Sequence, residues 1–243
     1  FRSMHMPERA RADSLLSFDR DGAKVAFETK NGVRTLTASF GEFSCHVELT
    51  PVFAQSATVC TPFAKPNEFY YNEKVNLLKA VVSARVGETD YAFDPDRTFS
   101  LLDWGRGVWP FHHEWYWSSV STLLGGVPFG FNLGCGFGDE ARVRGTENIV
   151  YYKDQIVKLG RMRFTMEDLA DPMRPWKLEA DDGRFSAVLT PRYDRDSITK
   201  LLFVNNRCHQ MFGTFAGEFT SPSGERVAFD NVTGFAEHAI NRW

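Results

Sequence analysis

The sequence has no long hydrophobic run, no closely spaced cysteines and no excess of either charge. No stretch approaches the roughly 18 apolar residues that a membrane-spanning helix requires, so we expect no membrane span. Lys and Arg number 28 against 31 Asp and Glu, a balance without the basic footprint of a nucleic-acid-binding protein. We therefore expect neither nucleic acid nor a membrane span, while enzymes and ligand-binding proteins stay open.

The N-terminus lacks the charged and then apolar pattern of a secretory signal peptide, which predicts a cytoplasmic protein. The chain starts at Phe1, before its first methionine, Met4. We therefore expect either that an upstream part is missing or that the first residues are foreign to the natural protein. The oligomeric state cannot be inferred from these features.

The four cysteines are widely separated, and no histidines stand at the spacing of a structural zinc site. We expect them to be reduced and to lie in or near the core, because free cysteine is among the most buried residue types. No Gly-x-Ser-x-Gly elbow occurs, and no cysteine has an obvious activating base, so covalent catalysis is disfavoured. The glycine-rich stretch 134–138 is followed by no amphipathic helix, so we expect no bound dinucleotide there. We also expect no other cofactor, because proton transfer combined with confinement of a substrate needs none.

What the sequence does contain is the pattern typical of β-hairpins. Short alternating segments are separated by turn signals such as Asp21-Gly22 and Asn31-Gly32, which supply the positive φ that tight hairpins need. Residues 51–76 contain three prolines and are expected to form a long connection that could include a strand around Thr58. One helical turn is expected at 166–170.

About fifteen strands without repeated helices favour an antiparallel barrel or sandwich over an α/β fold. The predicted class is all-β with very little helix. We expect residues 1–76 to form an N-terminal β segment with its long connection, and residues 77–243 to form the main barrel-like domain.

The stretch from Asp103 to Trp117 holds four tryptophans, two histidines and three charged side chains in fifteen positions. Its glycines and Pro110 predict a bend over residues 104–110. A strand from His112 onward would alternate two sets of side chains. One face would be titratable, with His112, Glu114 and Tyr116, and the other aromatic, with His113, Trp115 and Trp117.

Several titratable residues are candidates for chemistry, and each has a structural alternative. Asp103 and Arg106 could form a charge-assisted pair that fixes the bend. His112 and Glu114 could be a general acid and base or a surface pair. Glu147-Asn148 could orient a substrate or satisfy buried backbone. His209 and the Glu237-His238 pair could join the other histidines in a metal site, although no spacing is diagnostic.

The ordered motifs resemble a microbial family, domain of unknown function 2804 (DUF2804). The matching motifs are Asp103-Trp104-Gly105-Arg106-Gly107-Val108-Trp109-Pro110, Trp115-Tyr116-Trp117, Thr146-Glu147-Asn148, Asp171-Pro172-Met173-Arg174-Pro175-Trp176, His209-Gln210-Met211-Phe212-Gly213 and Gly234-Phe235-Ala236-Glu237-His238. The family is distantly similar to the lipocalin-like hydroxyneurosporene synthase / AttH group, which includes kievitone hydratase and certain Diels–Alder cyclases. The resemblance implies two β-barrel-like halves with a cavity for a hydrophobic ligand, the first half being truncated here.

The leading hypothesis is a lipocalin-like protein that binds an apolar or amphipathic small molecule, in its stronger form a cofactor-independent hydratase, isomerase or cyclase. The acid/base candidates are Asp103, His112, Glu114, His209, Glu237 and His238. The substrate-binding candidates are Trp104, Arg106, Trp109, Trp115, Trp117, Asn132, Glu147 and Asn148, with Arg106 orienting Asp103. The competing class is a non-catalytic β scaffold whose motif is structural, and a metal-dependent enzyme is third.

Overall fold

A computed structural model describes residues 12–139, 142–168 and 170–242. These residues form seventeen strands and contain no helix, which confirms the all-β prediction, and none of them forms a helix that could cross a membrane. By its internal contacts the chain divides into two compact units, 1–54 with 77–100 and 55–76 with 101–243. The expected boundary after residue 76 falls inside a continuous strand, and an independent domain over 77–243 stays a prediction.

The first unit is an antiparallel meander. Its own strands are β1 (Ser14–Arg20), β2 (Ala23–Lys30), β3 (Val33–Phe40), β4 (Phe43–Pro51) and β7 (Thr89–Ala92). The sheet is completed by the C-terminal part of β6 (Phe69–Val86), which pairs with β4 and β7. Asp21, Gly22, Asn31 and Gly32 all have positive φ at the two predicted turns, because these residue types adopt that region at little cost.

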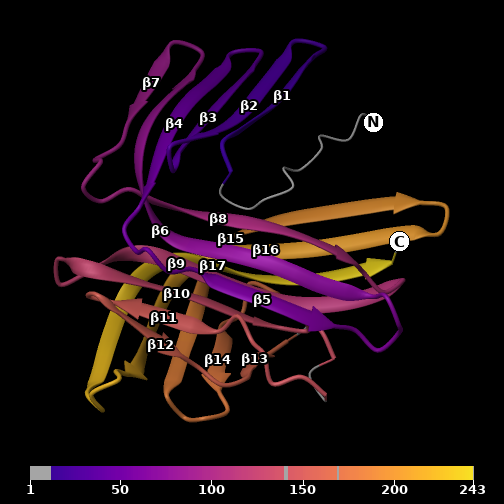
Figure 1. Ribbon diagram of the computed structural model, residues 1–243, viewed down its shortest axis with the longest axis vertical. Helices are drawn as coiled ribbons and strands as arrows, with labels where there is room; N and C mark the ends of the chain where they lie inside the picture. Colours follow the sequence, from indigo (N-terminus) through magenta and orange to yellow (C-terminus); the bar gives the residue numbers. More distant parts are fainter. Residues whose placement is uncertain (1–11, 140–141, 169, 243) are drawn as a thin grey trace. The chain divides into compact units, whose positions relative to one another are not determined.

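The second unit contains the N-terminal part of β6, paired with β5 (Ala57–Pro62), and most of β8 (Phe99–Val108). It also contains a nine-stranded antiparallel sheet in the order β12-β11-β10-β9-β17-β16-β15-β14-β13 (Figure 1). Its strands are β9 (His112–Leu124), β10 (Val127–Cys135), β11 (Ile149–Tyr152), β12 (Gln155–Lys158), β13 (Met162–Met166), β14 (Trp176–Ala180), β15 (Phe185–Leu201), β16 (Val204–Thr220) and β17 (Arg226–Arg242). The sheet curls into a half-barrel, and β13 comes back into contact with β10.

The inside of the half-barrel holds the main core. Phe131 packs edge-on against Phe185 and Phe215, and all three side chains are almost completely buried. Aromatic side chains of this size each bury a large apolar area, so this cluster stabilises the curled sheet. Side chains on the opposite face of β9 and β17 point away from this core, and the candidate site lies there.

Three local predictions were wrong. Residues 69–76 belong to β6 and not to a connection. Residues 198–207, whose apolar character predicts a single strand, form a hairpin that turns at Leu202 and Phe203 instead. The expected helical turn at 166–170 is also absent from the described residues, since Met166 ends β13, and residue 169 lies outside them.

The bend predicted over residues 104–110 is correct only at its end, because β8 continues to Val108 and the chain leaves regular strand at 109–111. The two glycines serve close approach to β6 instead. A Cβ at Gly105 would lie 2.6 Å from the Tyr71 carbonyl oxygen, and one at Gly107 would lie 2.4 Å from the Phe69 carbonyl oxygen. Glycine at these positions therefore lets β8 approach β6 closely enough to place Asp103 beside it.

Candidate functional site

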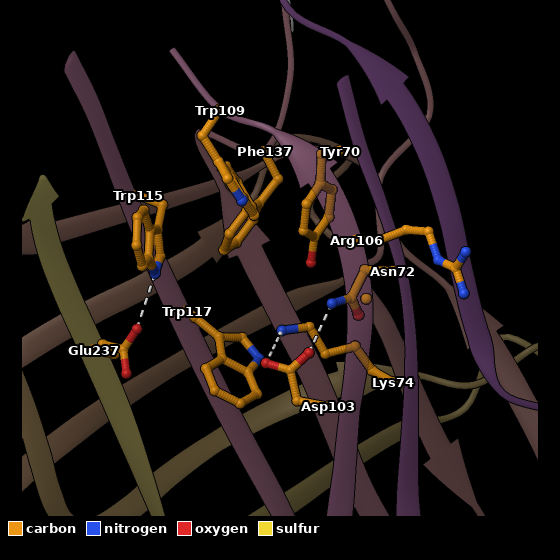
Figure 2. A pocket seen from close by; sticks show the side chains of 11 residues that line it. Tyr70, Asn72, Lys74, Asp103, Arg106, Trp109, Trp115, Trp117, Phe137 and Glu237 are labelled. Atoms are coloured by element: carbon orange, nitrogen blue, oxygen red, sulfur yellow. Dashed lines mark hydrogen bonds and ion pairs between the residues drawn. The ribbon is translucent and has the colours of Figure 1, made fainter. Parts of the chain in front are cut away.

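The second unit contains a cavity of about 390 Å³ that combines tryptophans with charged side chains (Figure 2). Strands β6, β8, β9 and β17 line it, together with one residue between β8 and β9 and one residue after β10. The lining residues are Tyr70, Asn72, Lys74, Asp103, Gly105, Arg106, Trp109, Trp115, Trp117, Phe137 and Glu237. Six residues predicted from sequence are among them: Asp103, Arg106, Trp109, Trp115, Trp117 and Glu237.

Strand β6 supplies three pocket residues that sequence reasoning missed. Tyr70, Asn72 and Lys74 occupy alternate positions and therefore share one face of the strand. The side chain of Lys74 is only 2% exposed, an unusual position for an amine. The alternation of these residues was the available signal, but the prolines of 51–76 favoured a connection.

Asp103 is the carboxylate on which this part of the pocket converges. Its Oδ1 accepts a hydrogen bond from Asn72 Nδ2 at 2.7 Å, and its Oδ2 lies 3.0 Å from Lys74 Nζ. The side chain nevertheless keeps 37% of its surface exposed. Asp103 is thus held in place by two donors and can still be reached from the cavity.

Arg106 does not take the expected part beside Asp103. Its guanidinium lies over the Trp104 ring, 5.0 Å from the centroid, and Figure 2 shows it pointing away from Asp103. The prediction that Arg106 orients Asp103 was wrong, because Lys74 and Asn72 of β6 take that position. Trp104, predicted to shape the pocket, packs edge-on against Tyr71 instead and does not line it.

Lys74 carries the buried positive charge of the site. Its Nζ lies 3.6 Å from the centroid of the Trp117 ring, a cation–π contact in a desolvated setting. It also lies 3.8 Å from Glu147 Oε1, so the ammonium group stands between two carboxyl groups. A buried charge is tolerated only with such partners, which ties the lysine to Asp103 and Glu147.

Glu147 lies behind the pocket wall. Complete burial raises the pKa of this carboxyl, and the neighbouring Asp103 charge adds to the rise, against the lowering effect of Lys74. The Tyr70 hydroxyl donates a hydrogen bond to Glu147 Oε2 at 3.0 Å, and burial raises the pKa of Tyr70 so that it keeps its proton. Glu147 is therefore a buried group that accepts protons readily. It contacts Tyr70 and Lys74, which line the cavity, and does not line the cavity itself.

The raised pKa of Glu147 makes the stability of the protein depend on pH. Below the unfolded pKa the residue is protonated in both states, and as pH rises the folded state must either retain the proton or bury a charge. The protonated Glu147 side chain therefore contributes stability that is lost as the pH rises through the pKa that Glu147 has in the folded protein. Urea unfolding at several pH values should show that the free energy of unfolding falls less with pH in Glu147→Gln than in the unchanged protein, because glutamine does not ionise. An equally steep loss in both proteins would show that Glu147 is not the group responsible.

Glu237 is the second carboxyl group of the pocket and comes from β17, directly opposite Trp117 in the strand register. Its Oε1 accepts from Trp115 Nε1 at 2.8 Å, and its Oε2 accepts from Gln210 Nε2 at 3.1 Å. The Cys208 thiol bonds to it as well, and burial together with the Glu237 charge raises the pKa of that thiol to about 12. Glu237 is held by neutral donors, in contrast to Asp103.

Aromatic rings form the remaining walls. Trp109 lies with its ring centroid 6.0 Å from Trp115 and 5.1 Å from Tyr70, and Phe137 stacks on Tyr70 at 4.9 Å. Behind them, burial lowers the pKa of His113, whose Nε2 bonds to the Gly136 carbonyl oxygen at 2.7 Å. These rings give the cavity an apolar surface suited to an apolar ligand body.

The other predicted acid/base residues lie on the opposite face of the sheet. His238 Nε2 lies 2.7 Å from Glu114 Oε1, and the His238 ring stacks on Tyr116 with centroids 4.3 Å apart. His209 Nδ1 lies 2.7 Å from Asp194 Oδ2. The predicted division of β9 into a titratable and an aromatic face is correct, because alternate residues of a strand point to opposite sides. The pocket lies on the aromatic face, so the titratable side chains of β9 point away from it.

His112 is exposed at the start of β9, packs edge-on against Phe111 and does not line the pocket either. The structure therefore does not bring His112, Glu114, His209 and His238 together with Asp103. No group of three or more His, Cys, Asp or Glu among the described residues has the arrangement of a metal site.

Two asparagines support the site from behind. Asn132 accepts from Trp117 Nε1 at 2.8 Å and donates to the Glu147 carbonyl oxygen at 3.1 Å. Asn148 accepts from the Gly134 backbone N–H at 2.6 Å and donates to the Gly160 carbonyl oxygen at 2.9 Å. Both are buried and do not line the cavity, so they hold the wall in place.

The fold and the pocket together define an all-β protein with a tryptophan-lined cavity that encloses two carboxyl groups and a buried lysine. The family model for domain of unknown function (DUF2804) matches residues 1–243, the full length of the chain. The protein belongs to this family. No curated protein matches its sequence.

Among solved structures, the chain is similar to kievitone hydratase from Nectria haematococca, with a TM-score of 0.52 and 14% sequence identity. The similarity covers 94% of this chain and 82% of the hydratase chain. At this identity the likeness concerns the fold. The two proteins therefore share an all-β fold, and the chemistry has to be argued from the pocket.

Proposed function

We propose that the protein binds an amphipathic small molecule with an apolar body in this pocket and catalyses a cofactor-independent proton-transfer reaction on it. The reaction class is addition of water to a double bond, or the related isomerisation or cyclisation. The observation that carries the proposal is Asp103, held by Lys74 and Asn72 and partly exposed in a cavity lined by three tryptophans. The hydratase among structures of similar fold supports the same class by analogy.

The two carboxyl groups have different roles in this reaction. Asp103 is held by Lys74 and Asn72 and is partly exposed in the cavity, so in this proposal it is the base that takes a proton from the attacking water or from a substrate carbon. Glu237 lines the cavity from β17 as the second carboxyl group, so it takes the role of the acid that delivers a proton. Addition of water is balanced when one carbon gains the proton of Glu237, the other gains hydroxide, and Asp103 takes the second proton of water.

The aromatic walls act on the intermediate. A carbon that becomes electron-poor after protonation is stabilised by the faces of Trp109, Trp115 and Trp117, in the way that Trp117 already faces the Lys74 ammonium group. The same rings hold the substrate in a reactive conformation. The pocket therefore combines proton transfer with confinement, and neither function requires a nucleotide.

Native mass spectrometry of the protein purified from its own host should detect a retained small molecule. Incubation of that molecule with the protein in deuterium oxide should then place deuterium on carbon, because each of the proposed reactions protonates a carbon from solvent. Folded protein that retains a ligand but gives neither a mass change nor deuterium on carbon would be a non-catalytic binding protein. Absence of any ligand would favour the structural scaffold.

A further inference from the structure

The turn of the β15–β16 hairpin carries large apolar side chains in full contact with solvent. Leu201, Leu202 and Phe203 are 67%, 93% and 64% exposed. Strand β17 ends at Arg242, opposite Asn205 of β16, so the tip lies beyond the last row of the three-stranded part of the sheet. Figure 1 shows this hairpin turn at the end of the two long orange strands.

The residue type at this turn is unusual. Leu202 has a φ of 52°, a backbone conformation that favours glycine, asparagine or aspartate. Two other tight turns of the same chain use those residues, Asp21-Gly22 and Asn31-Gly32. The hairpin therefore keeps an apolar side chain where backbone conformation opposes it and where, among the described residues, the side chain is almost fully exposed.

Basic side chains lie directly behind the tip. Lys200, Asn205 and Arg242 are register partners across three strands, so their side chains project from one face of the sheet. The next row on that face is Ile198, Arg207 and Ile240, and Arg207 has Asp196 at 4.0 Å. Residues 197–207 contain two basic residues and no acidic one, whereas the whole chain has a net charge of −3.

We propose that this tip is a membrane-docking element, with Leu201, Leu202 and Phe203 inserting among the lipids and Lys200, Arg207 and Arg242 facing anionic headgroups. An apolar anchor flanked by cations matches the layering of a bilayer surface, apolar below and negatively charged above. Charge complementarity favours an anionic membrane over a second copy of this chain, whose net charge is small. The inference rests on the hairpin alone and is independent of the reaction in the pocket.

Vesicle co-sedimentation of the full chain tests this surface, with phosphatidylcholine vesicles prepared with and without phosphatidylserine. We expect binding to be stronger with phosphatidylserine and to weaken as salt increases. The tip variant Leu201→Ser/Leu202→Gly/Phe203→Ser should lose binding to both vesicles by about tenfold or more, since it removes the inserting side chains. Tyr193→Ser is the matched control, because Tyr193 is 63% exposed on the same strand but far from the tip, and it should bind as the unchanged protein does.

The basic row is tested separately. Lys200→Gln/Arg207→Gln should reduce binding to phosphatidylserine vesicles by about fivefold per charge and leave phosphatidylcholine binding nearly unchanged. Arg195→Gln removes a charge from the same hairpin on the other face and should have a smaller effect. Circular dichroism checks that each variant is folded. Failure of the unchanged protein to bind either vesicle, or equal binding by the tip variant, would overturn the proposal, as would a tip-dependent dimer in analytical ultracentrifugation without vesicle binding.

Discussion

Lys74→Met is expected to lower the free energy of unfolding by about 3–5 kcal/mol. The substitution removes the positive charge that lies within ion-pair distance of both Asp103 and Glu147, and Glu147 is itself buried. Methionine preserves most of the side-chain volume, so the loss reports on charge and not on a cavity. The loss should be smaller at acidic pH, where Glu147 is protonated and needs no partner. Urea unfolding at pH values on both sides of neutrality measures it.

A double variant tests the origin of this loss. Lys74→Met/Glu147→Gln should recover part of the stability that Lys74→Met loses, because it removes the charge that would be left buried without a partner. The control is Lys79→Met, in the exposed ion pair with Asp96 at 3.0 Å, whose effect should stay below about 1 kcal/mol. If Lys74→Met were as mild as Lys79→Met, Lys74 would not be the centre of the buried network.

Asp103→Asn is expected to lower turnover of the retained substrate by about 100- to 10,000-fold, the contribution typical of a positioned acid or base. Asparagine keeps the shape of the side chain and can still accept from Asn72, but it cannot take a proton. Ligand binding, followed by quenching of the pocket tryptophans, should change much less than turnover does. Rate and affinity measured on the same preparation separate the two roles.

Stability has to be checked together with activity in this variant, because Asp103→Asn also removes a partner of Lys74. The assay is meaningful only at temperatures where the thermal unfolding curve shows the variant folded. Asp96→Asn is the control, since it removes an exposed carboxylate from the first unit without touching the pocket. Turnover by folded Asp103→Asn at the rate of the control would contradict its role as the base.

Strand and turn patterns predicted much of the fold, because both depend only on residues that are close together in the sequence. Alternating side chains and the Asp-Gly and Asn-Gly turns indicated an antiparallel all-β chain, and the two faces of β9 were assigned correctly. Errors in the predicted elements came where one residue type serves two structural purposes, as glycine does. Gly105 and Gly107 indicated a bend but serve close approach to Tyr71 and Phe69, a reason that exists only once β6 lies alongside.

The candidate site was only half predictable for the same reason. Asp103 and Glu237 were named from their motifs, but the titratable histidines drew attention to the wrong face of β9. Which face lines a pocket depends on what covers it, and the covering strand β6 had been taken for a connection. Lys74 was missed because a lysine in sequence is normally a solvated side chain.

The sequence by itself determined how hydrophobic and polar residues alternate along the strands, the family motifs and the aromatic character of the stretch from Asp103 to Trp117. Only the tertiary structure decided which of these side chains meet. Lys74 reaches Asp103 across 29 positions, Tyr70 reaches Glu147 across 77, and Trp115 reaches Glu237 across 122. Alternation along a strand is dictated by neighbouring residues, whereas the partner of a buried charge is dictated by strand pairing and burial, which bring distant segments together.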